Sequence, residues 1–308
     1  MNRAKYLTVL LSILFFSACV KDVDFNGAET APKMVVNSMI NSKSDSNLLK
    51  ISESVFIYSD NKPKIIENPN LQLKVNDFPV EVQFDHINNK NSYYRFNSQL
   101  LPGDKIELSG QTAEHGTVHG VDYVPSPPQI KSVKYEWFTG DDNYSYLRML
   151  ITISDRPGSK NYYRILIQEK TIFDYDGAPT EDELEWINTE VYIDQEMVFN
   201  NIDGVAGDSK FNHTYRIFPN DLFQGKDYTL NVYIRKDRGN PWGSVERRLV
   251  KVEIQSLTES LYLYLRSVEI ASNQDYFQEP VKVYSNIKGG YGILGIFNPT
   301  EKIIEPEK

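Results

Sequence analysis

The single cysteine of this 308-residue chain, Cys19, stands where its thiol could accept a lipid. Two small residues, Ser17 and Ala18, directly precede it, and signal peptidases require small residues before the bond they cleave. Cleavage there would place the thiol at a new N-terminus. The alternative is that Cys19 is simply a small apolar residue that ends an ordinary export signal. We predict lipid attachment at Cys19, and one cysteine excludes a disulfide framework and a Cys-rich metal site.

The segment before Cys19 has the pattern of a lipoprotein signal peptide, which we assign to residues 1–18. Arg3 and Lys5 are basic, and an apolar run of about ten residues follows from Leu7 to Phe16. A helix that spans a bilayer needs roughly 20 apolar residues, so this run is a signal and not an anchor. Residues 19–32 are polar and small, which predicts a lipidated tether.

The overall charge excludes one class of partner. The chain has 33 Lys and Arg against 42 Asp and Glu, a net charge of −9. A nucleic-acid-binding protein needs a basic surface, so no nucleic-acid partner is expected. With 40% hydrophobic residues the chain can bury a core.

Acidic side chains gather in two polar loops. The first contains Asp174, Asp176, Glu181 and Asp182, and the second contains Asp203 and Asp208. The first loop has the oxygen-rich composition of a calcium loop, but it lacks a third ligand position before Gly177 and a bidentate glutamate at the required distance. We predict solvated hairpin tips without metal, and they are our candidate contact loops for a glycan or peptide ligand.

Two histidines, His115 and His119, are four residues apart. They would share a face on a helix, but glycine and β-branched neighbours predict a loop or strand, and the metalloprotease glutamate is missing. No nucleophile elbow or Ser-His-Asp spacing occurs either. We therefore expect no catalytic residues, metal or cofactor, although two carboxylates suited to glycoside hydrolysis would leave no sequence signature.

Aromatic residues are frequent, with 20 Tyr, 15 Phe and 3 Trp. Several tyrosines could stack on a sugar or anchor a protein partner. The alternative is that they fill the core or form cross-strand pairs, which is the commoner use of aromatics in strands. The candidates are Tyr144, Tyr146, Tyr162, Tyr163, Tyr175 and Tyr192.

We expect strands to position the acidic, histidine and aromatic candidates named above, because apolar residues recur at every second position through most of the chain. We predict a mainly β fold of two β-sandwich domains of the immunoglobulin or fibronectin type, residues 33–124 and 129–308. The proline-rich segment 125–128 separates them, since proline removes backbone donors. Asn76-Asp77 predicts a hairpin turn within the segment from Leu71 to Phe84, and Pro102-Gly103 predicts a second turn.

One helix is expected near residues 257–271. The spacing of Ser256 and Glu259 is that of a capping box. An apolar stripe that includes Leu261 and Leu265 predicts packing against a sheet, with Glu259, Arg266 and Glu269 facing outward.

The stretch after this helix, Asn286-Ile287-Lys288-Gly289-Gly290-Tyr291-Gly292, resembles the C-terminal hallmark of the lipoprotein family from Bacteroidota known as domain of unknown function 4249. The pairs Pro102-Gly103 and Val124-Pro125 match the same family. Lys21, Asp22 and Asp24 resemble the Lys-led acidic tag that carries lipoproteins of that group to the cell surface, although a solvated tether would have the same composition. The glycines themselves predict a turn or a close backbone approach between strands.

The resemblance implies a lipoprotein of the outer membrane, facing the cell exterior, whose gene often lies beside that of a TonB-dependent transporter. It supplies no catalytic residues. We expect a non-enzymatic accessory or ligand-capture component associated with such a transporter. Two alternatives stay open at this point: a glycosidase-like surface hydrolase with paired carboxylates, and a structural or adhesion module of the envelope.

Overall fold

The computed structural model describes residues 31–56, 62–193, 196–200, 214–236, 244–273 and 281–307. The signal peptide, Cys19, Lys21, Asp22, Asp24, Asp203 and Asp208 lie outside the described residues, so those predictions stay predictions. Within the described ranges, no helix has both the length and the apolar character needed to cross a membrane.

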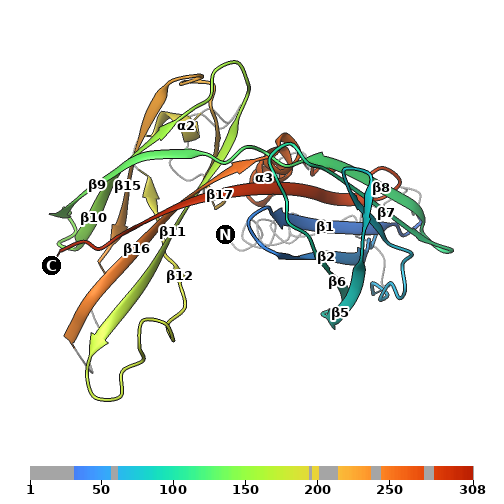
Figure 1. Cartoon of the computed structure of the whole chain (residues 1–308), viewed down its shortest axis with the longest axis horizontal. Coiled ribbons are helices and arrows are strands. Elements are labelled where there is room, and N and C mark those ends of the chain that lie inside the picture. The colour runs from blue at the N-terminus through green and yellow to red at the C-terminus, as the bar shows by residue number, and fades with distance from the viewer. Residues whose placement is uncertain are drawn as a thin grey trace, which may run out of the picture. The chain divides into compact units, whose positions relative to one another are not determined.

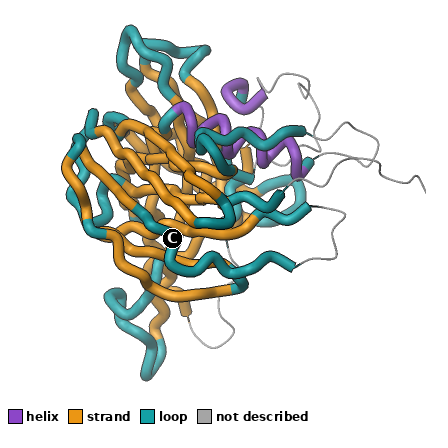
Figure 2. The backbone as a smooth tube through the Cα atoms, turned by 90° about the vertical axis from the view of Figure 1, so that its right-hand side faces the viewer, coloured by secondary structure: helices purple, strands orange, loops and turns teal. Residues whose placement is uncertain are grey.

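The described chain is mainly β, as predicted (Figure 2). The helices are the short α2 (Met197–Asn200) and the longer α3 (Glu259–Ser272). In chain order the strands are β1 (Met34–Asn41), β2 (Ser46–Glu53), β3 (Gln72–Val75), β4 (Phe78–Val80), β5 (Val82–Asn88), β6 (Asn91–Asn97), β7 (Lys105–Thr112), β8 (Gly116–Tyr123), β9 (Gln129–Thr139), β10 (Ser145–Ser154), β11 (Tyr162–Asp174), β12 (Ile187–Asn188), β13 (Tyr192–Ile193), β14 (Ile217–Pro219), β15 (Asp227–Arg235), β16 (Ser244–Leu257) and β17 (Tyr291–Ile304).

These strands form three sheets. A nine-stranded sheet has the order β12-β11-β16-β17-β1-β2-β6-β5, with β14 also pairing with β11. The two four-stranded sheets have the orders β13-β15-β10-β9 and β4-β3-β7-β8. The long strand β17 joins the two halves of the larger sheet, because its first half pairs in parallel with β1 and its second half pairs antiparallel with β16 (Figure 1).

Two large hydrophobic cores each take side chains from the nine-stranded sheet and from one four-stranded sheet. The first joins Leu147 and Met149 of β10 with Ile165 of β11 and Val252 of β16. The second joins residues of β1, β2 and β17 with residues of β3, β7 and β8. This sharing follows from the period of two, which places alternate side chains of a strand on the same face and so lets one face of a sheet line a core.

The proline-rich segment 125–128 has no helix or strand and lies between β8 and β9. The nine-stranded sheet takes strands from both sides of this segment, since β1 precedes it and β17 follows it. The proposed division of the chain at this segment stays a prediction.

The predicted hairpin turn at Asn76-Asp77 is confirmed. Both residues have positive φ angles, 50° and 68°, and they connect the antiparallel strands β3 and β4. Asparagine and aspartate tolerate this left-handed region better than most residues, which is why they suit two-residue hairpin loops. The turn at Pro102-Gly103 is also present, with Gly103 at a φ of 93°.

The helix is present where it was predicted, but its cap is different. Thr258 is the N-cap residue, and its side chain accepts a hydrogen bond from the Leu261 backbone N–H. The prediction that Ser256 caps the helix was wrong. Strand β16 continues through Leu257, so Ser256 stays in the sheet, paired with Tyr163 and Asn298.

The outward position predicted for Glu269 was also wrong. Its side chain is only 1% exposed and accepts a hydrogen bond from the Tyr215 backbone N–H at 3.0 Å. Burial raises the pKa of this carboxyl, and the nearby charges of Arg164 and Arg216 act in the opposite direction. A charged residue on the buried side of a helix is tolerated because it has these partners.

The glycine cluster at the start of β17 has the predicted close backbone approach. A Cβ at Gly292 would lie 1.9 Å from the Val36 carbonyl oxygen, and one at Gly289 would lie 2.1 Å from the Thr117 carbonyl oxygen. Both glycines also have positive φ angles. Only glycine fits here, and this allows β17 to enter the sheet beside β1.

Candidate functional site

The outward face of the four-stranded sheet β13-β15-β10-β9 carries an unusual set of side chains. On β10, residues Leu147, Met149 and Ile151 point into the first core. The alternate residues Tyr146 and Arg148 therefore lie on the opposite face.

Strand register places aromatic and polar residues beside one another on this face. Arg148 of β10 pairs with Tyr233 of β15 on one side and with Glu136 of β9 on the other. Tyr233 pairs in turn with Tyr192 of β13. In the next row, Tyr146 pairs with Phe138 of β9.

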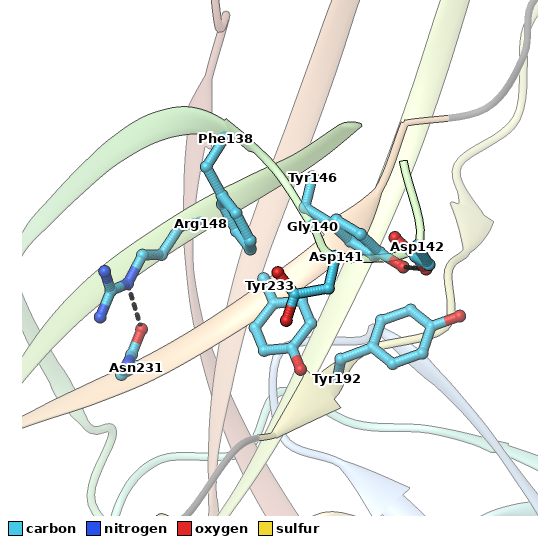
Figure 3. Close-up of a pocket in the computed structure, with 9 residues that line it drawn as sticks. All are labelled: Phe138, Gly140, Asp141, Asp142, Tyr146, Arg148, Tyr192, Asn231 and Tyr233. Carbon is cyan, nitrogen blue, oxygen red and sulfur yellow. Dashed lines mark hydrogen bonds between the residues drawn. The ribbon is translucent and has the colours of Figure 1, made fainter. Parts of the chain in front are cut away.

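These residues surround a surface pocket of about 480 Å³ (Figure 3). That volume lies within the range of roughly 300–1,000 Å³ that is usual for small-molecule sites. We call it the aromatic pocket; its lining residues are Phe138, Gly140, Asp141, Asp142, Tyr146, Arg148, Tyr192, Asn231 and Tyr233.

Four rings of the aromatic pocket form two stacked pairs. Tyr192 and Tyr233 are nearly parallel, with 9° between the planes and 5.5 Å between the centroids. Phe138 and Tyr146 stack at 5.4 Å and 24°. The two pairs meet edge to face, since Tyr146 makes an angle of 84° with Tyr192 and 90° with Tyr233. The pocket thus has two aromatic walls at about a right angle, and both are held in place by cross-strand packing.

Polar groups line the rest of the pocket. The Tyr146 hydroxyl donates to an Asp142 carboxylate oxygen at 2.5 Å, and Arg148 Nε donates to Asn231 Oδ1 at 2.8 Å. The first of these bonds raises the pKa of Tyr146 to about 12 and helps to hold the pKa of Asp142 below its ordinary value. Arg148 Nη1 also lies 3.4 Å from a Glu136 carboxylate oxygen. The side chains are therefore oriented before any ligand arrives.

Such a pocket can bind a ligand that has both an apolar face and hydrogen-bonding groups. The aromatic rings of the pocket can contact the apolar face of the ligand. The Asp141 carboxylate, the Asn231 amide and the Arg148 guanidinium provide hydrogen-bond acceptors and donors.

The structure brings together two of the tyrosines that were candidates from the sequence, Tyr146 and Tyr192. Tyr144 lies close by in the chain and takes the Arg235 guanidinium over its ring at 4.9 Å. Tyr162 and Tyr163 are instead buried in the cores, and Tyr175 lies in the first acidic loop.

Sequence reasoning missed Phe138, Asp141, Asp142, Arg148, Asn231 and Tyr233. The sequence signal that could have found three of them is the alternation of apolar and polar residues. Arg148, Asn231 and Tyr233 each lie between core positions on their strands. Alternation shows which residues share a face of one strand, but it does not show which strands are neighbours.

The first acidic loop does not contribute to the aromatic pocket. Asp174, Asp176, Glu181 and Asp182 are all exposed. Glu181 pairs with Arg247 at 3.0 Å, and its backbone carbonyl accepts a hydrogen bond from Lys170. Within the described ranges, no three His, Cys, Asp or Glu side chains are grouped so that they could hold a metal ion.

The two histidines have separate partners. His115 Nε2 lies 2.9 Å from a Glu53 carboxylate oxygen, and His119 Nε2 lies 3.0 Å from a Glu107 carboxylate oxygen. Each histidine of the β7–β8 hairpin therefore makes a polar contact with a different carboxylate.

Comparison with known proteins places the chain in a family. The family model described as "Domain of unknown function (DUF4249)" matches residues 20–303. No curated protein matches the chain. A solved structure described as "Biofilm associated protein - B domain" aligns over 88% of this chain and 86% of its own, at 8% identity and a TM-score of 0.17. A similarity that weak supports no conclusion about fold or function.

Proposed function

The chain belongs to the DUF4249 family, and from this premise we propose that it is a surface-exposed outer-membrane lipoprotein that captures a ligand without catalysis. Acyl chains on Cys19 hold the protein at the membrane. The folded residues serve as an accessory component of a TonB-dependent transporter, to which the captured ligand passes.

The aromatic pocket is the observation that carries this proposal. Its rings and polar groups are held by hydrogen bonds and stacking, as expected of a site that binds with little rearrangement. The signal-peptide pattern before Cys19 and the Lys21-Asp22-Val23-Asp24 segment support the placement at the cell surface.

A binding role suits the pocket better than a hydrolytic one. General acid catalysis by a carboxyl needs a pKa raised towards neutrality. The hydrogen bonds that Asp142 accepts from the Tyr146 hydroxyl and the Tyr144 backbone N–H instead lower its pKa, which keeps this carboxyl ionised.

We propose that the fold consists of two β-sandwiches and that it serves to present the ligand site. Each four-stranded sheet shares a hydrophobic core with part of the nine-stranded sheet, and this supports two β-sandwiches of the immunoglobulin or fibronectin type. Such a scaffold would present the aromatic pocket on a rigid outer sheet face.

Lipid attachment is tested by metabolic labelling with a fatty-acid probe. The wild-type chain is expected to carry label and to fractionate with the outer membrane, and Cys19→Ser should lose both properties. The matched control is a variant with Lys21, Asp22 and Asp24 replaced by Ala, which keeps Cys19. It should stay labelled but lose accessibility to protease added to whole cells. An unlabelled wild-type chain would overturn the placement.

Association with a transporter is tested by affinity purification from membranes in a mild detergent. A TonB-dependent barrel should co-purify with the tagged wild-type protein. If the protein is recovered at full yield without a barrel, and instead promotes attachment of cells to a surface, the adhesion alternative replaces this proposal.

A further inference from the structure

We propose that the aromatic pocket binds a neutral oligosaccharide, an inference that rests on the proposed function because it names the class of ligand captured. The lining of the pocket, its charge and the state of the surrounding backbone each bear on this choice.

The two aromatic walls match the shape of a sugar ring. A pyranose presents a flat face of C–H groups, which packs on the face of an aromatic side chain. The nearly parallel Tyr192 and Tyr233 form one such wall on β13 and β15. The exposed Phe138, which stacks on the buried Tyr146, forms the other. The walls meet at about a right angle. A sugar ring that packs on one wall therefore has its edge, which carries the hydroxyl groups, near the other residues of the pocket.

The polar groups match the hydroxyl groups. A sugar hydroxyl both donates and accepts a hydrogen bond, so it needs partners of both kinds. Asp141 supplies carboxylate acceptors, Arg148 supplies N–H donors, and the Asn231 amide has both kinds of atom. A purely apolar ligand would remove these groups from water without offering hydrogen bonds in return, at a cost in binding free energy.

Charge favours a neutral sugar over an acidic one. Asp141 and Asp142 line the pocket, and the cation among the described lining residues, Arg148, already pairs with Glu136 at 3.4 Å. The nearby Arg235 guanidinium lies over the Tyr144 ring, and its charge contributes to the lowered pKa of Asp142. An added carboxylate or sulfate on the ligand would meet this negative charge without a free cation among the described lining residues.

A peptide fits less well, because the two strands beneath the centre of the pocket, β10 and β15, are already paired on both sides. Peptides commonly bind to sheets by adding a strand at an open edge, where main-chain groups are free. The pocket instead lies over the centre of the sheet, and β10 is paired on both sides, with β9 and with β15. Gly140 also lines the pocket, but its N–H and carbonyl groups are already paired with Tyr144 and Asn143, so side chains supply the free contacts for a ligand there.

The test is a binding screen of the purified chain from residue 20 onward on an array of immobilised neutral and acidic oligosaccharides, with immobilised peptides beside them. Hits are measured in solution by titration calorimetry. We expect binding to neutral oligosaccharides and weaker or no binding to oligogalacturonate and sulfated sugars.

Variants then locate the site. Tyr192→Ala removes half of one wall from the two-residue strand β13 and should weaken binding by about tenfold. Tyr192→Phe keeps the ring and loses only the hydroxyl bond to Glu190, so it should bind like the wild type. Tyr123→Ala is the matched control, since Tyr123 is 57% exposed at the end of β8 and does not line the pocket. Thermal melting confirms that each variant is folded.

The inference is overturned if no neutral oligosaccharide binds, if a peptide binds in its place, or if Tyr192→Ala binds as tightly as Tyr123→Ala. These results differ from a failure of the proposed function. A barrel that co-purifies with a protein that binds no sugar leaves the transporter role standing, whereas sugar binding without a barrel leaves the pocket assignment standing.

Discussion

The carboxylate of Glu53 in β2 lies 2.9 Å from Nε2 of His115, although 62 residues separate them in the chain. Both side chains are only 7% exposed. The second carboxylate oxygen of Glu53 accepts the Lys64 backbone N–H at 2.6 Å. This pair joins a strand of the nine-stranded sheet to the β7–β8 hairpin of a four-stranded sheet.

Removing this carboxylate is expected to destabilise the fold. Burial raises the pKa of Glu53, but the hydrogen bonds from Lys64 and His115 outweigh it, so the pKa lies below 4.5. A lowered carboxyl pKa stabilises the native state above the unfolded-state value and loses that contribution as the pH falls through the folded-state pKa. Glu53→Ala should therefore lower the free energy of unfolding by about 2 kcal/mol at pH 7 and by less near pH 3. Urea unfolding at both pH values measures this.

The control for Glu53→Ala is Glu81→Ala, because Glu81 is exposed. It should change the free energy of unfolding little at either pH. Equal effects of the two variants at pH 7 would contradict a stabilising role for the buried pair.

Asp122 of β8 should make the fold less stable at neutral pH than at mildly acidic pH. Burial raises its pKa from 3.8 to about 6, and hydrogen bonds from Thr258 and the Tyr123 backbone N–H oppose this only in part. Because the folded-state pKa is above the unfolded one, the native state holds the proton more tightly. The contribution of Asp122 to stability therefore falls as the pH rises from about 4 to about 6, by on the order of 2–3 kcal/mol.

The variant Asp122→Asn removes the charge and keeps the shape. We expect it to raise the melting temperature at pH 7.5 and to flatten the dependence of stability on pH between 4 and 6. Asp176→Asn, in the exposed loop, should leave both unchanged. A pH profile of Asp122→Asn identical to that of the wild type would disprove the assignment.

Asp155 organises a turn through four hydrogen bonds. Its side chain accepts from the Tyr163 hydroxyl at 2.6 Å, from the Asn161 and Asn220 amides at 2.8 Å, and from the Gly225 N–H at 2.7 Å. Every partner is a donor, so neither Ala nor Asn can replace the carboxylate without leaving donors unsatisfied. Asp155→Ala should lower the free energy of unfolding by more than about 3 kcal/mol. Asp155→Asn should also destabilise the fold, but by less.

Chemical unfolding of these two variants, with Asp174→Ala as the exposed control, tests the role of Asp155. If Asp155→Asn unfolds at the wild-type denaturant concentration, the four bonds contribute little and the argument fails.

Gly292 should be intolerant of any side chain. A Cβ there would lie 1.9 Å from the Val36 carbonyl oxygen, so Gly292→Ala must push β17 away from β1. We expect little folded protein, as judged by soluble yield and circular dichroism. Gly177→Ala has a similar positive φ of 83° but no atom within 4 Å of its Cβ, so it should cost only about 1–2 kcal/mol of backbone strain. Similar yields of the two variants would show that β17 can shift.

The amino-acid sequence by itself determined the local features of this protein. Alternating apolar residues specified strands, Asn76-Asp77 specified a hairpin turn, and the glycines at the start of β17 specified a close approach. These features depend on dihedral preference and side-chain period, which act over a few residues.

The tertiary structure decided which strands became neighbours. Strands β4 and β5 are separated only by Glu81 yet lie in different sheets, and β17 pairs with β1, which lies some 250 residues earlier in the chain. Predicting the aromatic pocket also requires knowing which strands are neighbours, because its four rings come from four strands. They are Phe138, Tyr146, Tyr192 and Tyr233. Strand partners are selected by the burial of whole faces over long sequence separations, and no local pattern records that choice.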